Sequence, residues 1–453
     1  MSAVKTAIVI GAGDRGARYA SFARAFPGKL KVTGVAEPSP ARKERMVREH
    51  GIAPGSAFSS WEEILDGPLR ADGAIIATQD ALHAEPAVRA MERGYRVLLE
   101  KPMALTPEDC AMIVEASRRT GMSLNVCHVL RYTGFFAAVK RVIDGGMLGD
   151  VYTIFHAENV SYYHMAHSYV RGNWGQSSVA SPMVLAKCCH DMDLVAWFAG
   201  SAPLRVASFG ALGHFTAGNA PAGAPGRCTE GCPAAPGCAY EAVDTYLRGK
   251  HMKRALAAVD SVPMRALARF MLGFPRLAAR MPVLSRYATW KEWPTSTITD
   301  DLSESGILRA LREGPYGRCV YRCDNDQVDH QETIIEFANG TTAVLRMHGH
   351  SAREGRTLRI DGSLGTLRGA YGGGGRLEIL LHRTGKRVRI PVKTDLLGHA
   401  EGDYGLMENF ARVLAGEAGA TTAEESLASH LMAFAAHESR ITGNIVPVKG
   451  ERA

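Results

Sequence analysis

A glycine-rich turn close to the N-terminus constrains the fold more strongly than any other feature of the sequence. A short β-branched run, AIVI, leads through Gly11, Gly13 and Gly16 into an Ala- and Arg-rich helical pattern. In such a strand–turn–helix unit the first glycine permits the tight turn, the second lets the backbone approach a pyrophosphate, and the third allows close helix–strand packing. Unpaired N–H groups at the start of the helix also attract the anion. The pattern therefore predicts a dinucleotide-binding βαβ unit.

An acid at the end of the second strand pattern bears on the choice of dinucleotide. The run LKVTGVAE ends in Glu37, where a carboxylate accepts hydrogen bonds from both hydroxyls of the adenosine ribose. A carboxylate there also repels a 2'-phosphate, so the sequence favours NAD over NADP, although Arg42 and Lys43 follow closely and weaken that preference. The alternative is that Glu37 is an ordinary surface acid at a strand end.

Strand and helix patterns alternate through the first part of the chain. Strand patterns occupy residues 73–78 and 96–100, with a helical segment between them. This alternation predicts right-handed βαβ units and a parallel sheet that binds ligands beyond the carboxyl ends of its strands. We therefore expect a doubly wound Rossmann domain over residues 1–130. The polar side chains at those strand ends are Thr78, His83, Glu100 and Lys101.

The tripeptide EKP at residues 100–102 holds a lysine at the end of a strand, because proline lacks an N–H group and fixes φ. Together with the glycine turn, Glu37, Thr78 and His83, it resembles the glucose-fructose oxidoreductase, inositol dehydrogenase and MocA (Gfo/Idh/MocA) family. The resemblance extends over nearly the whole chain through RY at 131–132, HDMDL at 190–194 and RIDGSLGTL at 359–367. This combination is far more specific than any single motif.

The resemblance implies a Rossmann domain followed by a C-terminal α+β domain, residues 131–453, with a large, open, mainly antiparallel sheet. One face of that sheet would cover the active site, and the other would join subunits into a homodimer or tetramer. In the family the EKP lysine, here Lys101, hydrogen-bonds the reacting hydroxyl, and hydride leaves carbon more readily as that oxygen becomes alkoxide-like. The residues expected to contact the cofactor are Gly11, Gly13, Asp14, Arg15, Gly16, Glu37, Thr78, His83, Glu100 and Lys101.

The segment SPMVLAKCCHDMDLVAWFAG, residues 181–200, predicts one helix that ends at Gly200. We expect His190 to be the general base, because the unperturbed pKa of histidine lies close to neutrality. Helical spacing puts Lys187 on the same side, where its charge would keep His190 neutral and ready to accept a proton. The alternative is that Lys187 only forms an ion pair with Asp191.

The chain departs from the family pattern one turn before the histidine. Where the family carries an aspartate that shares the proton work or contacts the substrate, this sequence has Ala186. Lys187 is the nearest polar replacement on that side of the helix, so it is a third catalytic candidate beside Lys101 and His190. The side chains expected to line the substrate site are Tyr132, Lys187 and Asp191.

Five cysteines gather in two short segments of the second half. In a reduced compartment such thiols can close a tetrahedral structural zinc site, although these spacings are not those of a standard zinc finger. The alternatives are loop packing and a reducible thiol pair. The candidate zinc ligands are Cys228, Cys232, Cys238, Cys319 and Cys323.

Residues 215–315 read as an insertion within the substrate domain, with Pro and Gly breaks and the arginine-rich stretch 265–286. Arginines that alternate with apolar residues at helical spacing suit a helix laid on the protein's own surface or on a neighbouring subunit, and attachment to a membrane surface is the alternative. Farther on, amphipathic patterns at 403–416 and 421–443 predict helices that pack back on the Rossmann domain.

Overall composition narrows the classes of partner. The formal net charge of +7 is spread along the chain without a nucleic-acid-binding motif, so we expect no nucleic acid. No apolar run approaches the roughly 20 residues needed to cross a bilayer, and the N-terminal sequence enters a strand pattern without a signal peptide. We therefore expect a cytoplasmic protein without membrane insertion and with reduced cysteines.

These observations predict an enzyme: an NAD-dependent oxidoreductase that moves a hydride between nicotinamide and a hydroxyl of a sugar, polyol or glycoside. One alternative, suggested by the family, is an NAD-dependent glycoside hydrolase that oxidises its substrate transiently and needs a further base, for which Lys187, Tyr162 or Tyr163 would serve. Another alternative is a non-catalytic NAD-binding protein that senses redox state through its cysteines, which Ala186 would favour.

Overall fold

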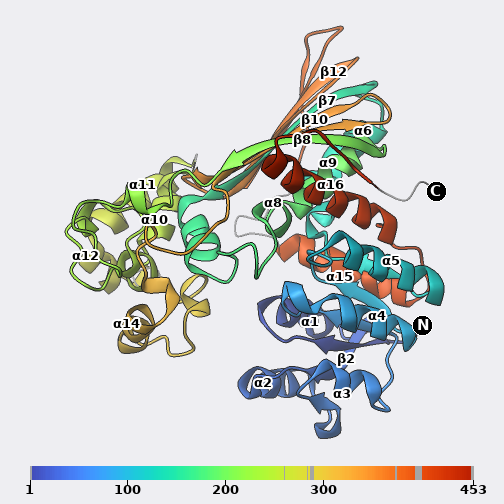
Figure 1. Cartoon of the computed structure of the whole chain (residues 1–453), viewed down its shortest axis with the longest axis horizontal. Coiled ribbons are helices and arrows are strands. Elements are labelled where there is room, and N and C mark those ends of the chain that lie inside the picture. The colour runs from blue at the N-terminus through green and yellow to red at the C-terminus, as the bar shows by residue number, and fades with distance from the viewer. Residues whose placement is uncertain are drawn as a thin grey trace.

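Two β-sheets organise the molecule, as the computed structural model in Figure 1 shows. It describes residues 3–259, 261–282, 284–285, 290–372, 375–392 and 400–449. The N-terminal sheet is parallel and carries helices on its faces, and the second sheet is larger and mixed. The predicted fold class is therefore confirmed, whereas the domain boundaries at residues 130 and 131 stay predictions.

The parallel sheet has the strand order β3-β2-β1-β4-β5-β6, which is that of a doubly wound dinucleotide fold. Its apolar strands, such as the AIVI run, are buried because helices cover the sheet. The strands are β1 (Lys5–Ile10), β2 (Leu30–Ala36), β3 (Ala57–Phe58), β4 (Gly73–Ile76), β5 (Arg96–Leu99) and β6 (Leu124–Val126). The helices are α1 (Asp14–Ala25), α2 (Pro40–His50), α3 (Trp61–Asp66), α4 (Ala84–Glu92) and α5 (Pro107–Thr120).

The second sheet has the order β14-β13-β12-β11-β7-β10-β9-β8-β15. Its strands pair antiparallel, except that β10 runs parallel to β7. Their bounds are β7 (Val151–Ser161), β8 (Pro203–Ala211), β9 (His330–Phe337), β10 (Thr342–Ser351), β11 (Gly355–Gly362), β12 (Gly365–Tyr371), β13 (Arg376–Leu381), β14 (Arg387–Arg389) and β15 (Val446–Pro447).

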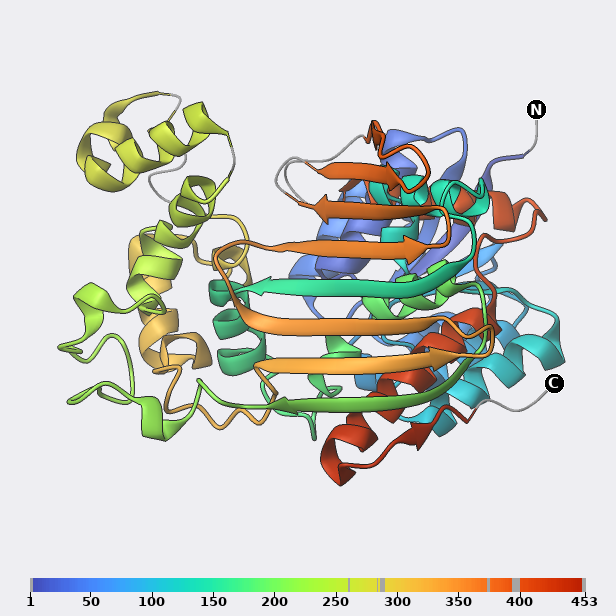
Figure 2. The ribbon, with the colours of Figure 1, turned by 90° about the horizontal axis from the view of Figure 1, so that it is seen from above.

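Helices α6 (Gly134–Asp144), α9 (Cys189–Ala199) and α16 (Ala423–Thr442) cover the inner face of this sheet. Strand β7 shows why the two faces differ: Ile154, His156 and Glu158 are buried, whereas Phe155 between them is exposed. Successive strand residues point to opposite faces, so the polar residues of β7 lie inside, against α9. The outer face is left uncovered by helices in Figure 2.

The helix predicted over residues 181–200 is divided in two. Helix α8 (Met183–Ala186) ends one residue before Lys187, and α9 begins after Cys188, so these two residues form a turn. The predicted end of the helix is right, because Gly200 adopts the left-handed conformation that favours glycine. The turn changes where the side chain of Lys187 points, with consequences for the site.

The two long C-terminal helices contact the N-terminal half of the chain. Helix α15 (Ala400–Leu414) packs on α1, and its Leu406, Met407 and Phe410 share a buried cluster with Val9 and Tyr19. Helix α16 lies between α5 and the large sheet, and contacts α9. The C-terminal helices therefore connect the parallel sheet to the inner face of the second sheet.

The insertion projects to one side of the molecule (Figures 1 and 2). Its helices are α10 (Lys250–Ala257), α11 (Val262–Gly273), α12 (Pro275–Arg280) and α14 (Glu304–Glu313). Within the described ranges, no helix combines the length and the apolar character needed to cross a bilayer.

Candidate active site

The glycine turn has the shape that a dinucleotide needs. Gly11 has φ 87°, and a Cβ atom there would lie 2.5 Å from the carbonyl oxygen of Ala77. A Cβ atom on Gly16 would lie 1.9 Å from the carbonyl oxygen of Gly11, so both glycines serve the packing of the turn. A Cβ atom on Gly13, by contrast, would have Nη1 of Arg42, at 4.0 Å, as its nearest neighbour. Gly13 is the N-cap residue of α1, and no side chain caps this end of the helix. The open surface at a helix N-terminus fits a pyrophosphate.

Glu37 lies under this turn instead of at the surface. It is buried, and its two carboxylate oxygens accept hydrogen bonds from the backbone N–H groups of Ala12, at 2.7 Å, and Ser39, at 2.9 Å. Arg45 donates to the carbonyl oxygen of Ala12 at 3.0 Å. The acid is therefore fixed beside the glycines, where the adenosine ribose would be expected.

Two predicted cofactor residues instead join each other by an ion pair. Nε of Arg15 lies 2.7 Å from Oε1 of Glu100, and Nη2 of Arg15 lies 2.6 Å from Oδ1 of Asp403 on α15. Burial alone would raise the pKa of Glu100, but Arg15 and Lys101 hold it below its ordinary value. These side chains tie the glycine turn to the EKP segment and to α15. Because its side chain is engaged in these pairs, a cofactor contact from Arg15 would come from its backbone at the start of α1.

His83 and Thr78 hold the loops that surround Lys101. The fully buried His83 ring has Nδ1 at 2.7 Å from the carbonyl oxygen of Pro102 and Nε2 at 3.3 Å from the carbonyl oxygen of Thr78. The hydroxyl of Thr78 donates to the carbonyl oxygen of Leu82 at 2.8 Å. His83 therefore joins the loop after β4 to the loop after β5, which is a positioning role.

Lys101 extends from the parallel sheet to the start of the candidate catalytic helix. Its Nζ atom donates to the carbonyl oxygen of Ala186 at 2.9 Å, and its backbone N–H donates to Oε2 of Glu100 at 2.5 Å. The Ala186 carbonyl ends α8, and His190 lies in the first turn of α9. The His190 side chain is 9% exposed, and its ring centroid lies 5.9 Å from that of the buried His128. The structure thus brings the EKP segment and the HDMDL segment together.

Lys187 does not take up the predicted position beside His190. Because it lies in the turn between α8 and α9, its Nζ atom is 2.8 Å from Oε1 of Glu354 and 3.4 Å from Oε1 of Glu158. Burial alone would lower the pKa of Lys187, but Glu354 and Glu158 together raise it above the ordinary lysine value. The proposed pairing with Asp191 is therefore wrong, since the continuous helix that it required is broken.

Asp191 is also displaced from its predicted role as a substrate ligand. It is completely buried, with Oδ1 at 2.7 Å from both Nε2 of His156 and Nε of Arg356. Burial would raise the pKa of Asp191, but Arg356 and His156 hold it well below its ordinary value. Arg356 also lies 2.5 Å from Oε2 of Glu158. Asp191 therefore belongs to a buried ionic network beneath the site and has no surface to offer a sugar.

Sequence reasoning missed three polar side chains that surround Lys187. Nδ1 of His164, in α7 (Tyr162–His164), lies 2.9 Å from Oε1 of Glu354, and burial followed by the charge of Lys187 lowers the pKa of this histidine. Burial raises the pKa of Glu158 to about 7 despite Arg356 and Lys187. The period-two pattern of β7 could have assigned Glu158 to the inner face, whereas Glu354 precedes β11 and carries no local signal.

Tyr132 lies apart from these groups. It packs in the buried cluster of Leu406 and Met407, and a Cβ atom on Gly405 of α15 would lie 2.8 Å from its Cβ atom. The preceding Arg131 forms a two-pronged pair with the buried Asp193, with both N···O distances at 2.7 Å. The structure favours a packing role for Tyr132 over the predicted contact with substrate.

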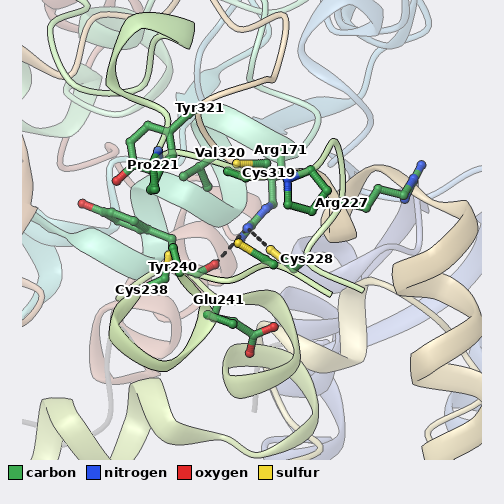
Figure 3. Close-up of a pocket in the computed structure, with 15 residues that line it drawn as sticks. Arg171, Pro221, Arg227, Cys228, Cys238, Tyr240, Glu241, Cys319, Val320 and Tyr321 are labelled. Atoms are coloured by element: carbon green, nitrogen blue, oxygen red, sulfur yellow. Dashed lines mark hydrogen bonds between the residues drawn. The ribbon is translucent and has the colours of Figure 1, made fainter. Parts of the chain in front are cut away.

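The cysteines of the insertion line a small pocket with a buried arginine at its wall (Figure 3). Arg171 donates to the carbonyl oxygen of Tyr240 at 2.8 Å and lies 3.5 Å from Sγ of Cys228. All nine cysteines are free thiols, and in the described part of the chain no group of three or more His, Cys, Asp or Glu side chains is arranged to hold a metal ion. The predicted zinc site is therefore not supported. The candidate ligands Cys228, Cys232, Cys238, Cys319 and Cys323 surround a guanidinium group, which would oppose a cation.

Comparison with known proteins agrees with this architecture. Two family models match: the NAD-binding Rossmann fold of the Gfo/Idh/MocA oxidoreductase family at residues 5–128, and its C-terminal α/β domain at residues 140–225. A scyllo-inositol 2-dehydrogenase (NAD(+)) of Bacillus subtilis is 32% identical over 142 residues, which cover 31% of this chain and 40% of that protein. A 2,7-anhydro-N-acetylneuraminate hydratase of Escherichia coli is 27% identical over 202 residues, or 45% of this chain and 51% of that protein.

Structural similarity extends much farther than these sequence matches, which span about half of each relative or less. The crystal structure of an oxidoreductase from Agrobacterium radiobacter in complex with NAD+, L-tartaric acid and magnesium has a TM-score of 0.64 to this chain. The alignment covers 98% of each chain at 14% identity, so it shows a shared fold. With both family domains matched and the EKP and HDMDL segments brought together in the structure, the chain belongs to the Gfo/Idh/MocA oxidoreductase family.

Proposed function

We propose that this protein is an NAD-dependent oxidoreductase that moves a hydride between nicotinamide and the carbon of a sugar, polyol or glycoside hydroxyl. The observation that carries the proposal is the 2.9 Å contact of the Lys101 ammonium group with the Ala186 carbonyl oxygen. This contact puts the lysine at the end of α8, four residues before His190. A cation and a proton acceptor on either side of one hydroxyl are the groups that alcohol oxidation requires.

Each side chain has a distinct part in this reaction. When bound, NAD supplies the nicotinamide that accepts the hydride. Lys101 donates a hydrogen bond to the substrate hydroxyl and stabilises the negative charge that develops on its oxygen. His190 accepts the hydroxyl proton. The open surface above Gly13 and the N-terminus of α1 hold the pyrophosphate.

Lys187, Glu354 and His164 form the polar wall of the proposed substrate site. The Lys187 side chain is 12% exposed and that of Glu354 34% exposed, so the wall can be reached by solvent. A carboxylate, an ammonium group and an imidazole offer both hydrogen-bond acceptors and donors, as the several hydroxyls of a sugar require. Neighbouring carboxylates keep Lys187 protonated, so we assign it to substrate binding instead of proton transfer.

NAD is preferred over NADP in this proposal because Glu37 would meet the 2'-phosphate. The two N–H groups that bind its carboxylate oxygens keep that negative charge fixed beside the glycine turn. Arg42, whose Nη1 atom is the nearest to a Cβ atom on Gly13, would attract a 2'-phosphate and so weakens the preference for NAD. It does not remove the repulsion between Glu37 and that phosphate.

The raised pKa values of two candidate bases count against the glycoside hydrolase alternative. Burial raises the pKa of Tyr163 well above its ordinary value, and carboxylates raise that of Lys187, so both groups stay protonated at neutral pH. The redox-sensor alternative remains distinguishable by experiment, because it predicts NAD binding without turnover.

We also propose that subunits pair through the outer face of the large sheet. Phe155 on β7, Ile334 on β9 and Phe209 on β8 are exposed on that face, and helices leave it uncovered (Figure 2). Exposed apolar side chains on a broad flat surface favour a protein partner. A homodimer or tetramer formed in this way would leave the proposed substrate site, on the inner side of the sheet, uncovered.

The deciding experiment follows NADH absorbance while the full-length protein and NAD are offered inositols, free sugars, polyols and aryl glycosides. The proposal expects NADH formation with at least one of them, and a loss of about 100-fold or more in Lys101→Met and His190→Asn. Lys140→Met, a surface lysine paired with Asp144, is the control and should keep full activity. Release of aglycone without NADH would favour the hydrolase, and NAD binding without any turnover would favour the sensor.

A further inference from the structure

Helices α11 and α12, in the middle of the insertion, form a helical pair that lies away from both sheets. Helix α11 packs on α10 and on α12, and the pair has its own small cluster, in which Met271, Ala278 and Leu284 are buried. Figure 2 shows these helices projecting beyond the ends of the strands of the large sheet. The pair is therefore a separate surface, tied to the molecule mainly through α10.

This helical pair exposes large apolar side chains. Phe274 is 61% exposed, Leu277 is 53% exposed and Met281 is 42% exposed. Their spacing of three and four residues puts them on one side of α12 and its flanking residues. Val262 and Leu267 of α11 are exposed as well. Several exposed apolar residues on one separate element indicate a binding surface.

The same surface is strongly basic. No aspartate or glutamate occurs between residues 261 and 291, whereas four arginines lie within α11 and α12. Arg276 and Arg280 are exposed and, at a spacing of four residues, share the side of α12 next to the apolar one. Arg269 of α11 is exposed too. Apolar residues flanked by arginines are the pattern of a helix that lies in the plane of a lipid surface.

We propose that α11 and α12 dock the protein on the surface of an anionic lipid bilayer, with Phe274 and Leu277 in the interface and Arg276 and Arg280 at the lipid phosphates. Charge complementarity selects this partner, because anionic headgroups attract arginine while the acyl boundary accepts apolar side chains. A second copy of the same surface fits less well. A symmetric contact would bring arginines against arginines.

The experiment is co-sedimentation of the full-length protein with phosphatidylcholine vesicles that either contain or lack phosphatidylglycerol. The expected result is binding only to the phosphatidylglycerol vesicles, weakened as salt is raised because the headgroup charges are screened. Arg276→Gln should lower the partition constant about five-fold, and Arg276→Gln with Arg280→Gln should lower it further. Phe274→Ser with Leu277→Ser should lower it by about ten-fold or more.

Matched surface variants separate this interaction from general stickiness. Leu364→Ser removes a 58% exposed leucine in the turn between β11 and β12, and Arg387→Gln removes an exposed arginine on β14; both should bind vesicles like the unchanged protein. Unchanged thermal unfolding of each variant shows that it folds. Binding to neutral vesicles alone, no binding to either kind, or full binding by Phe274→Ser/Leu277→Ser would overturn the proposal. Sedimentation velocity that detects self-association lost in that variant, without vesicle binding, would assign the surface to a second copy instead.

Discussion

The Nζ atom of Lys187 lies 2.8 Å from Oε1 of Glu354, so the lysine that follows α8 is already paired before any substrate arrives. Nδ1 of His164 lies 2.9 Å from the same oxygen. Glu354 therefore contacts both Lys187 and His164, and the wall of the proposed substrate site depends on this one carboxylate.

Replacing Glu354 by glutamine should lower kcat/KM for the best substrate by about ten- to a hundred-fold, because a charged hydrogen bond is lost and Lys187 and His164 become free to move. NAD affinity should stay unchanged, since in this proposal the glycine turn and Glu37 bind the dinucleotide and the wall binds the substrate. Steady-state kinetics and a fluorescence titration with NAD measure the two effects. Glu332→Gln, an exposed glutamate paired with Arg346, is the control. Unaltered kinetics of Glu354→Gln would remove Glu354 from the site.

Arg356 should be essential for stability. It is the cation that faces both Glu158 and Asp191 in the buried network. Arg356→Met removes the guanidinium group that both buried carboxylates share and should lower the free energy of unfolding by about 3–5 kcal/mol. Arg359→Met, three residues along the same strand but exposed, should change it by less than about 0.5 kcal/mol. Urea denaturation of both variants tests the contrast, and equal effects would contradict it.

Glu158 should make the stability of the protein depend on pH. Its pKa is raised by burial to about 7, so the folded chain holds this proton where the unfolded chain, with an ordinary glutamate pKa, releases it. The contribution of Glu158 is present below the ordinary pKa of glutamate and is lost as pH rises towards 7. Denaturation across this range should show a steeper decline for the unchanged protein than for Glu158→Gln. Parallel curves would count against the raised pKa.

Gly13 and Gly11 should respond differently to alanine. The position above Gly13 is open, so Gly13→Ala should fold normally while its affinity for NAD falls about ten-fold or more, because the methyl group keeps the pyrophosphate from the backbone. In Gly11→Ala the new Cβ atom would meet the Ala77 carbonyl oxygen, and the positive φ is unfavourable, so stability itself should fall. Thermal unfolding and NAD titration together separate the two roles. Unchanged NAD affinity in Gly13→Ala would place the cofactor elsewhere.

Glu37→Gln should shift the preference between the two dinucleotides. Removing the negative charge lessens the repulsion of a 2'-phosphate beside Arg42, so the ratio of kcat/KM for NAD to that for NADP should fall by about ten-fold. The amide keeps one oxygen to accept the N–H group of Ala12 or Ser39. Kinetics with each dinucleotide measure the ratio, and an unchanged ratio would return Glu37 to a purely structural role.

The fold could be predicted from the sequence because its signals are local. Three glycines in a strand–turn–helix context and alternating apolar runs specify a parallel sheet, and the tripeptide EKP marks a strand end. The order of the large sheet could not be derived from residue patterns, because β7 pairs with β10 and β11, far away in the sequence.

The site was less predictable because its partners come from distant segments. Helical spacing assigned Lys187 to His190 and Asp191 on the assumption of one continuous helix. Because the helix is interrupted at residues 187–188, the Lys187 side chain points towards Glu158 and Glu354 instead. Arg15 shows the same limit, since its place in the glycine motif gave no sign that its partners would be Glu100 and Asp403.

The contact between Lys101 and the Ala186 carbonyl oxygen also affects how a substrate would bind. The ammonium group has three N–H donors, so one can stay on this carbonyl oxygen while another binds the substrate hydroxyl. The carbonyl contact therefore fixes the direction of the Lys101 side chain before any substrate binds. Selectivity among sugars would then rest with the hydrogen-bond donors and acceptors on the wall formed by Lys187, Glu354 and His164.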